Sequence, residues 1–255
     1  MDHQTSLGHN RTGIQMSPVD SARMKAGADE TPMDGADPQD YVRVRQGYID
    51  DKGLGTVPPP GTLKGVASSG VEMLTGKRPQ TLVDKLGERL AFERGGVRLY
   101  DSLLAKCEGS PDSVPDEAIR QLRRFRDEEV QHLRLVITAI ESLGADPTAQ
   151  TPCADLVGVE SMGLVQAMND PRTNVLQSLH VMLDAEVLDN AAWDMLVELA
   201  RATGHDDLAD GFAIAVQQEA DHLIHLRALV SRLTLADAHA GSPNAASMDT
   251  ASEAH

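Results

Sequence analysis

The chain has 255 residues, of which 41% are hydrophobic and only 3% aromatic, and its formal net charge is −16. This acidity argues against nucleic-acid binding through a broad basic face, because such a surface repels phosphate. No apolar stretch approaches the length of a membrane span, and the N-terminus lacks the apolar core of a signal peptide. The sequence therefore predicts a cytoplasmic protein with neither a membrane nor a nucleic-acid partner, and its two cysteines are too few for a disulfide framework.

The two ends of the chain differ in composition from its middle. Residues 1–80 are rich in Gly, Pro, Asp and Ser and show no apolar periodicity, which predicts an extended or disordered N-terminal arm. One short helix is possible within residues 63–76. Residues 237–255 are a second low-complexity stretch, predicted to be a disordered C-terminal tail.

Residues 81–236 contain four segments in which apolar residues recur at spacings of three and four, typical of amphipathic helices. The expected helices span residues 82–107, 114–143, 170–203 and 207–236. Capping signals mark their ends: Thr81 with Asp84, Ser113 with Asp116, and Asp170 before Pro171 as starts, and Gly144 and Gly204 as stops.

The connections between these helices differ in length. Short loops join the first helix to the second and the third to the fourth, which makes each pair antiparallel neighbours. Residues 144–170 are long enough to cross the bundle from end to end, with a short helix of their own. The predicted fold is an all-α antiparallel four-helix bundle with a long crossover between helices 2 and 3.

Polar residues interrupt the apolar face of every predicted helix. The interrupting residues are Glu93 in the first, Glu129 and His132 in the second, Glu186 in the third, and Glu219 and His222 in the fourth. Each Glu-x-x-His pair places a carboxylate and an imidazole on one helix face. Charged side chains are almost never fully buried unless they are paired or bind metal. No Arg or Lys shares these stripes, so two metal ions are favoured over a buried hydrogen-bonded polar network or an ion-pair layer.

The two predicted helix pairs also resemble each other. The glutamates of helices 1 and 3 are 93 residues apart, and the Glu-x-x-His motifs of helices 2 and 4, in EEVQHL and QEADHL, are 90 residues apart. Near-constant spacing indicates two related hairpins packed about a pseudo-twofold axis.

The order E…ExxH…E…ExxH resembles the ferritin-like di-iron carboxylate superfamily of ferritins, rubrerythrins and manganese catalases, over residues 82–236. The resemblance implies two iron ions, with manganese possible, and Glu129 and Glu219 as bridging ligands. It also implies reaction with dioxygen or peroxide by a ferroxidase or peroxidase linked to oxidative stress, in a homodimer or higher homo-oligomer. A manganese-catalase-like enzyme and a non-enzymatic iron-sequestering protein remain alternatives.

Some features depart from these relatives. Rubrerythrins commonly carry an extra ligand glutamate one turn before the equivalent of Glu186, where this chain has Leu183, and a Cys₄ domain, which it lacks. Ferritin cages commonly end in a short fifth helix, whereas this chain ends in a polar stretch.

Further residues are expected near the metals. Tyr100 is the candidate catalytic residue, because it lies two turns beyond Glu93 on the same stripe and could bond a ligand or relay electrons; simple packing is the alternative. Trp193 has the matching place after Glu186, where packing is favoured, and Asn190 is a possible partner of a ligand. Candidates for the outer imidazole nitrogens, or for a solvated face, are Glu128, Asp189 and Asp221. His225, one turn past His222, is a weaker candidate for contact with the site.

Overall fold

The computed structural model describes residues 17–30, 38–47, 49, 54–63, 65–67, 70 and 78–239. Within these residues the regular secondary structure is helical, with no strand, which confirms the all-α prediction for this part of the chain. Among the same residues no helix is both long enough and apolar enough to cross a bilayer. Most of the predicted helix at 63–76, and residues 240–255 of the predicted tail, lie outside them.

Two helices occur in the region expected to be extended. They are α1, Pro18–Glu30, which has no buried residue, and α2, Pro38–Gln46. Each begins with a proline, which favours a first helical turn, and Asp40 pairs with Arg43 one turn along α2. These two helices were not predicted, because apolar periodicity does not detect a helix without a buried face. The division of the chain at residue 80 stays a prediction.

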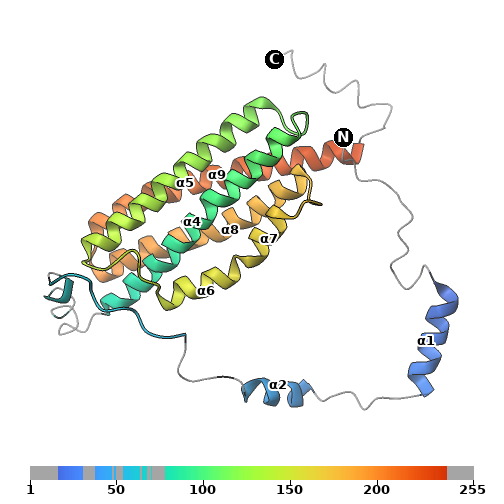
Figure 1. Ribbon diagram of the computed structural model, residues 1–255, viewed down its shortest axis with the longest axis horizontal. Coiled ribbons are helices and arrows are strands. Elements are labelled where there is room, and N and C mark those ends of the chain that lie inside the picture. Colours follow the sequence, from blue (N-terminus) through green and yellow to red (C-terminus); the bar gives the residue numbers. More distant parts are fainter. Residues whose placement is uncertain are drawn as a thin grey trace. The chain divides into compact units, whose positions relative to one another are not determined.

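Four long helices form the main packed unit (Figure 1): α4, Pro79–Gly109; α5, Asp116–Ser142; α8, Val175–Thr203; and α9, Asp206–His239. Helix α4 packs against α5 and α8, and α9 packs against α8 and α5. Residues 110–115 turn α4 into α5, and residues 204–205 turn α8 into α9, so each pair is an antiparallel hairpin.

The connection from α5 to α8 carries two short helices, α6, Pro152–Glu160, and α7, Met162–Asn169, where one was expected. Both pack against α4, and α7 also packs against α8. Thr151, the N-cap of α6, donates a hydrogen bond to the carbonyl of Asp84 at 3.2 Å. A Cβ on Gly87 would collide with the Thr151 side chain, so glycine permits this close contact. The connection is thereby held against α4.

The three predicted helix starts differ from the observed ones. Helix α4 begins at Pro79, and the Asp84 carboxylate accepts a hydrogen bond from the amide of Cys153 instead of capping α4. Helix α5 has no side-chain cap, because the Ser113 hydroxyl donates to the carbonyl of Ser110.

The third long helix begins five residues later than predicted, at Val175 rather than Asp170. Asn174 and Gln177 form a reciprocal capping box there. Asp170 instead accepts hydrogen bonds from the backbone and side chain of Arg172. The predicted stops are confirmed, since Gly144 and Gly204 have φ of 76° and 83° just past the ends of α5 and α8.

Buried apolar side chains form two clusters, one toward each end of the four long helices. The first cluster contains Leu99, Tyr100, Leu103, Phe125, Leu179 and Leu226, and the second contains Leu86, Val136, Trp193, Leu196 and Phe212, among others. On every long helix, the polar residues predicted as ligands fall between members of the two clusters. The packing of these clusters therefore holds the polar side chains in the interior, away from water.

Candidate metal centre

The six predicted ligand residues come together in the interior. Each is at most 2% exposed. Their ligand atoms form two groups, within each of which all atoms lie within 4.8 Å of one another. Position A consists of Glu93, Glu129, His132 and Glu219, and position B consists of Glu129, Glu186, Glu219 and His222. Glu129 and Glu219 belong to both positions, and their role as bridging ligands stays a prediction.

Both histidines turn their Nδ1 atoms toward the carboxylates. His132 Nδ1 lies 2.7 Å from Glu219 Oε1 and 3.9 Å from Glu93 Oε2. His222 Nδ1 lies 3.3 Å from Glu219 Oε2, 3.5 Å from Glu129 Oε1 and 3.6 Å from Glu186 Oε2. Neither Nδ1 has hydrogen-bond geometry to any of these oxygens.

The buried polar atoms at the centre lack hydrogen-bond partners. They are Glu93 Oε2, both carboxylate oxygens of Glu129, Glu186 Oε2, both carboxylate oxygens of Glu219, and Nδ1 of His132 and His222. Leaving such groups unsatisfied in the interior is costly, and a cation would satisfy them. Four carboxylates balance two divalent ions, and oxygen donors with imidazole suit iron and manganese. The residues therefore fit a two-metal group.

The outer nitrogen of each imidazole has a partner that fixes the ring. His222 Nε2 bonds Glu128 Oε2 at 2.8 Å, which confirms the expectation for Glu128. His132 Nε2 bonds Gln218 Oε1 at 3.0 Å. Such contacts orient a ligand ring and tune its basicity. Gln218 was missed, although the alignment of EEVQHL with QEADHL matches it to Glu128.

Arg89 overturns the expectation that no basic side chain reaches the ligand stripe. It is 2% exposed, and its Nε lies 3.0 Å from Glu93 Oε1. A terminal guanidinium nitrogen lies 2.7 Å from Asp189 Oδ1, so Asp189 partners Arg89 and not an imidazole. The Trp193 indole N–H donates to Glu93 Oε1 at 2.9 Å. Glu93 is thus held through one oxygen, and its other oxygen faces position A.

Tyr100 and Asn190 support the other half of the centre. The Tyr100 hydroxyl donates a hydrogen bond to Glu186 Oε1, as expected of a partner to a ligand, while its catalytic role stays a prediction. Asn190 reaches backbone rather than side chains, since its amide donates to the carbonyls of Glu186 and Glu219 at 3.0 and 2.9 Å. It therefore joins α8 to α9 beside both residues.

Two other candidates lie away from the six residues. Asp221 pairs with Arg124 at 2.7 Å, on the surface, rather than with an imidazole. His225 is bonded through Nδ1 to the carbonyl of Asp221 at 2.8 Å and belongs to neither position.

The electrostatics reflect this crowding of carboxylates. Burial raises the pKa of Glu93, Glu129 and Glu186 well above the ordinary value. Burial also pushes the pKa of Glu219 upward, but contacts with the two imidazoles outweigh it and hold that pKa low. For His222, burial lowers the pKa while three facing carboxylates raise it far more strongly.

Gly96 makes room for the Glu129 side chain, which belongs to both positions. A Cβ at this position would lie 2.5 Å from Glu129 Oε2. Glycine inside a helix costs about 1 kcal/mol relative to alanine, so its presence in the middle of α4 has a steric purpose. In the sequence, this requirement is visible as a glycine three residues after Glu93.

Comparisons of the chain with protein-family models, curated proteins and solved structures found no match. A function is therefore inferred from the site itself.

Proposed function

We propose that this protein is a ferritin-like di-metal protein. In this proposal α4, α5, α8 and α9 are the four-helix bundle, and the connection through α6 and α7 is its crossover. The observation that carries the proposal is the set of buried carboxylate and Nδ1 atoms without hydrogen bonds, all from the six residues that the sequence pattern singles out.

The roles of the six residues follow from their grouping. Glu129 and Glu219 would bridge two iron ions, Glu93 and His132 would complete position A, and Glu186 and His222 would complete position B. Such ions supply one-electron redox chemistry toward dioxygen or peroxide. The chain itself contributes fixed carboxylates, an interior closed to bulk water, and the Tyr100 hydroxyl, which holds a proton at Glu186 Oε1. We propose a ferroxidase or peroxidase-type activity on this basis.

Replacing a shared ligand tests the site directly. We expect purified wild-type protein to carry about two metal ions per chain and Glu129→Ala to carry almost none, with an unchanged helical circular-dichroism spectrum. Glu141→Ala, at an exposed position of the same helix, is the matched control and should retain both ions. Elemental analysis measures the content. A Glu129→Ala protein with as much metal as the wild type would refute the assignment.

The activity is tested on the loaded protein. Ferrous oxidation and peroxide loss should both be compared with free metal, after loading with iron and, separately, with manganese. Faster turnover with iron supports the proposed activity, and turnover confined to manganese would point to a catalase. Bound metal without turnover would leave sequestration as the better account.

A further inference from the structure

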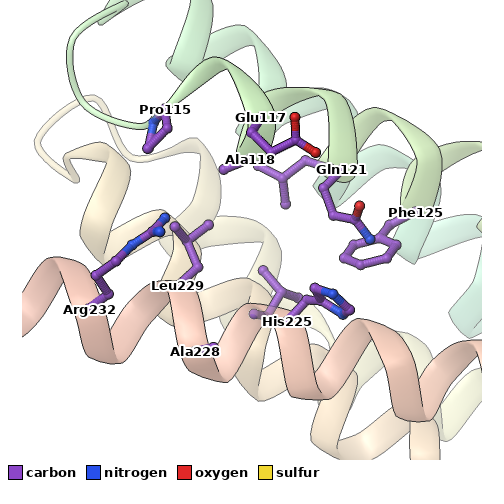
Figure 2. Close-up of a pocket in the computed structure, with 11 residues that line it drawn as sticks. Pro115, Glu117, Ala118, Gln121, Phe125, His225, Ala228, Leu229 and Arg232 are labelled. Carbon is purple, nitrogen blue, oxygen red and sulfur yellow. The ribbon is translucent and has the colours of Figure 1, made fainter. Parts of the chain in front are cut away.

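A cavity of about 390 Å³ lies between α5 and α9, beside position B (Figure 2). Its walls are mainly apolar and include Ala118, Leu122, Leu226 and Leu229. Small-molecule sites have volumes of about 300–1,000 Å³, are mostly apolar and carry a few polar groups that fix orientation. The cavity has the size and lining of such a site.

One aromatic side chain separates the cavity from the metal centre. Phe125 lines the cavity, and its ring centroid lies 4.2 Å from that of His222. Phe125 precedes Glu129 by one turn of α5, and Leu226 follows His222 by one turn of α9. A molecule in the cavity would therefore touch residues that pack directly on ligands of position B.

The polar groups of the cavity call for an acceptor. The Gln121 Nε2 atom is buried without a hydrogen-bond partner. Glu117 is already paired with Arg120, whereas Arg232 has no ion pair among the described residues. In Figure 2, Arg232 lies at the end of the cavity opposite Phe125. The charge without a partner is therefore positive, and it lies at one end of a mainly apolar space.

We propose that this cavity binds a small carboxylate with an apolar body, its head at Arg232 and its body extending toward Phe125. The inference depends on the proposed function only in making that molecule the substrate of the metal centre. Binding itself needs no metal, so the two proposals can fail separately.

Octanoate is the probe, and octanol, of the same chain length without the charge, is the comparison. In calorimetric titrations of the metal-free full-length chain, we expect one octanoate per chain and binding of octanol that is about fivefold weaker. Arg232→Gln should weaken octanoate binding about fivefold, since the lost contact is an exposed charge pair. Leu229→Trp, which fills the cavity, should abolish it. Arg227→Gln, an exposed arginine on α9 outside the cavity, should have no effect.

The link to the metal centre has its own measurement. In protein loaded with Co²⁺, octanoate should shift the visible absorption of the bound ion, because Phe125 contacts His222, and Leu229→Trp should abolish the shift. Absence of saturable octanoate binding, or equal binding by Arg232→Gln and Arg227→Gln, would overturn the site. Tight binding with an unmoved cobalt spectrum would overturn its connection to the metals. If the chain holds no cobalt, the proposed function fails, while the titration of the metal-free chain still decides the cavity.

Discussion

The two candidate metal positions share Glu129 and Glu219 but are surrounded differently. At position A, the neutral amide of Gln218 supports His132, and the buried guanidinium of Arg89 lies against Glu93. At position B, the carboxylate of Glu128 supports His222, and the neutral hydroxyl of Tyr100 lies against Glu186. The two hairpins thus repeat the positions of these partners with different residue types, since Gln218 matches Glu128 and Trp193 matches Tyr100.

This difference should affect how tightly each position binds a divalent metal ion. A carboxylate behind an imidazole raises the basicity of the ligand, whereas a guanidinium beside a carboxylate competes with the metal for its charge. Asp189 balances the charge of Arg89 but does not supply a ligand atom. We therefore expect a divalent cation to fill position B first and position A second.

The largest expected effect comes from replacing Arg89, the buried guanidinium beside position A. Arg89→Leu leaves Asp189 buried without its partner, removes the guanidinium from Glu93, and should lower the free energy of unfolding of the metal-free protein by about 3 kcal/mol. Replacing both Arg89 and Asp189 by leucine should restore most of that loss, because an apolar pair can substitute for a buried ion pair. Urea unfolding measures both. A single variant as stable as the double variant would show that the pair is not coupled.

Glu128→Gln should remove the higher metal affinity of position B, because His222 would then have the same kind of partner as His132. We expect the affinity of position B to fall about tenfold, as is usual when the partner of a metal-bound imidazole is replaced. Titration with Co²⁺ should then show two similar steps in place of a tight and a weak one. Asp127→Asn, an exposed neighbour, is the control. Unchanged steps in Glu128→Gln would contradict the assigned order.

Tyr100→Phe should have the smallest effect of the three. It removes one hydrogen bond to Glu186 and keeps the ring that packs edge-on against Phe125. We expect the affinity of position B to fall about threefold, the size expected for one hydrogen bond. Tyr41→Phe, on α2, is the control. A loss as large as that of Glu128→Gln would assign Tyr100 a larger part in metal binding.

The ligand register was predictable because each of the six residues interrupts an apolar stripe, and a stripe shows which face of a helix is buried. Gln218 could also have been predicted from the internal repeat, which matches it to Glu128. Arg89 was not, because an arginine on a helix normally extends its head into water. Its burial depends on Asp189, 100 residues away on α8, and no periodicity within α4 reveals that partner.

The predicted helix starts were wrong because other hydrogen-bond donors compete for the predicted capping residues. Asp84 and Asp170 are good capping residues, but each accepts a hydrogen bond from another donor. For Asp84 the donor is Cys153, which only the folded chain brings near, and for Asp170 it is Arg172, two residues along the chain. Local signals predict an end correctly where no such competitor exists, as at Gly204, whose left-handed backbone depends on that residue alone.

The space beside Gly96 offers a way to look for relatives of this chain. A shared carboxylate in this orientation leaves no room for a side chain three residues after the first glutamate. The pattern E-x-x-G, followed by two E-x-x-H motifs about 90 residues apart, therefore carries more information than the ligands alone. Scanning uncharacterised helical sequences for it would separate chains that share this packing from those that have glutamates and histidines by chance.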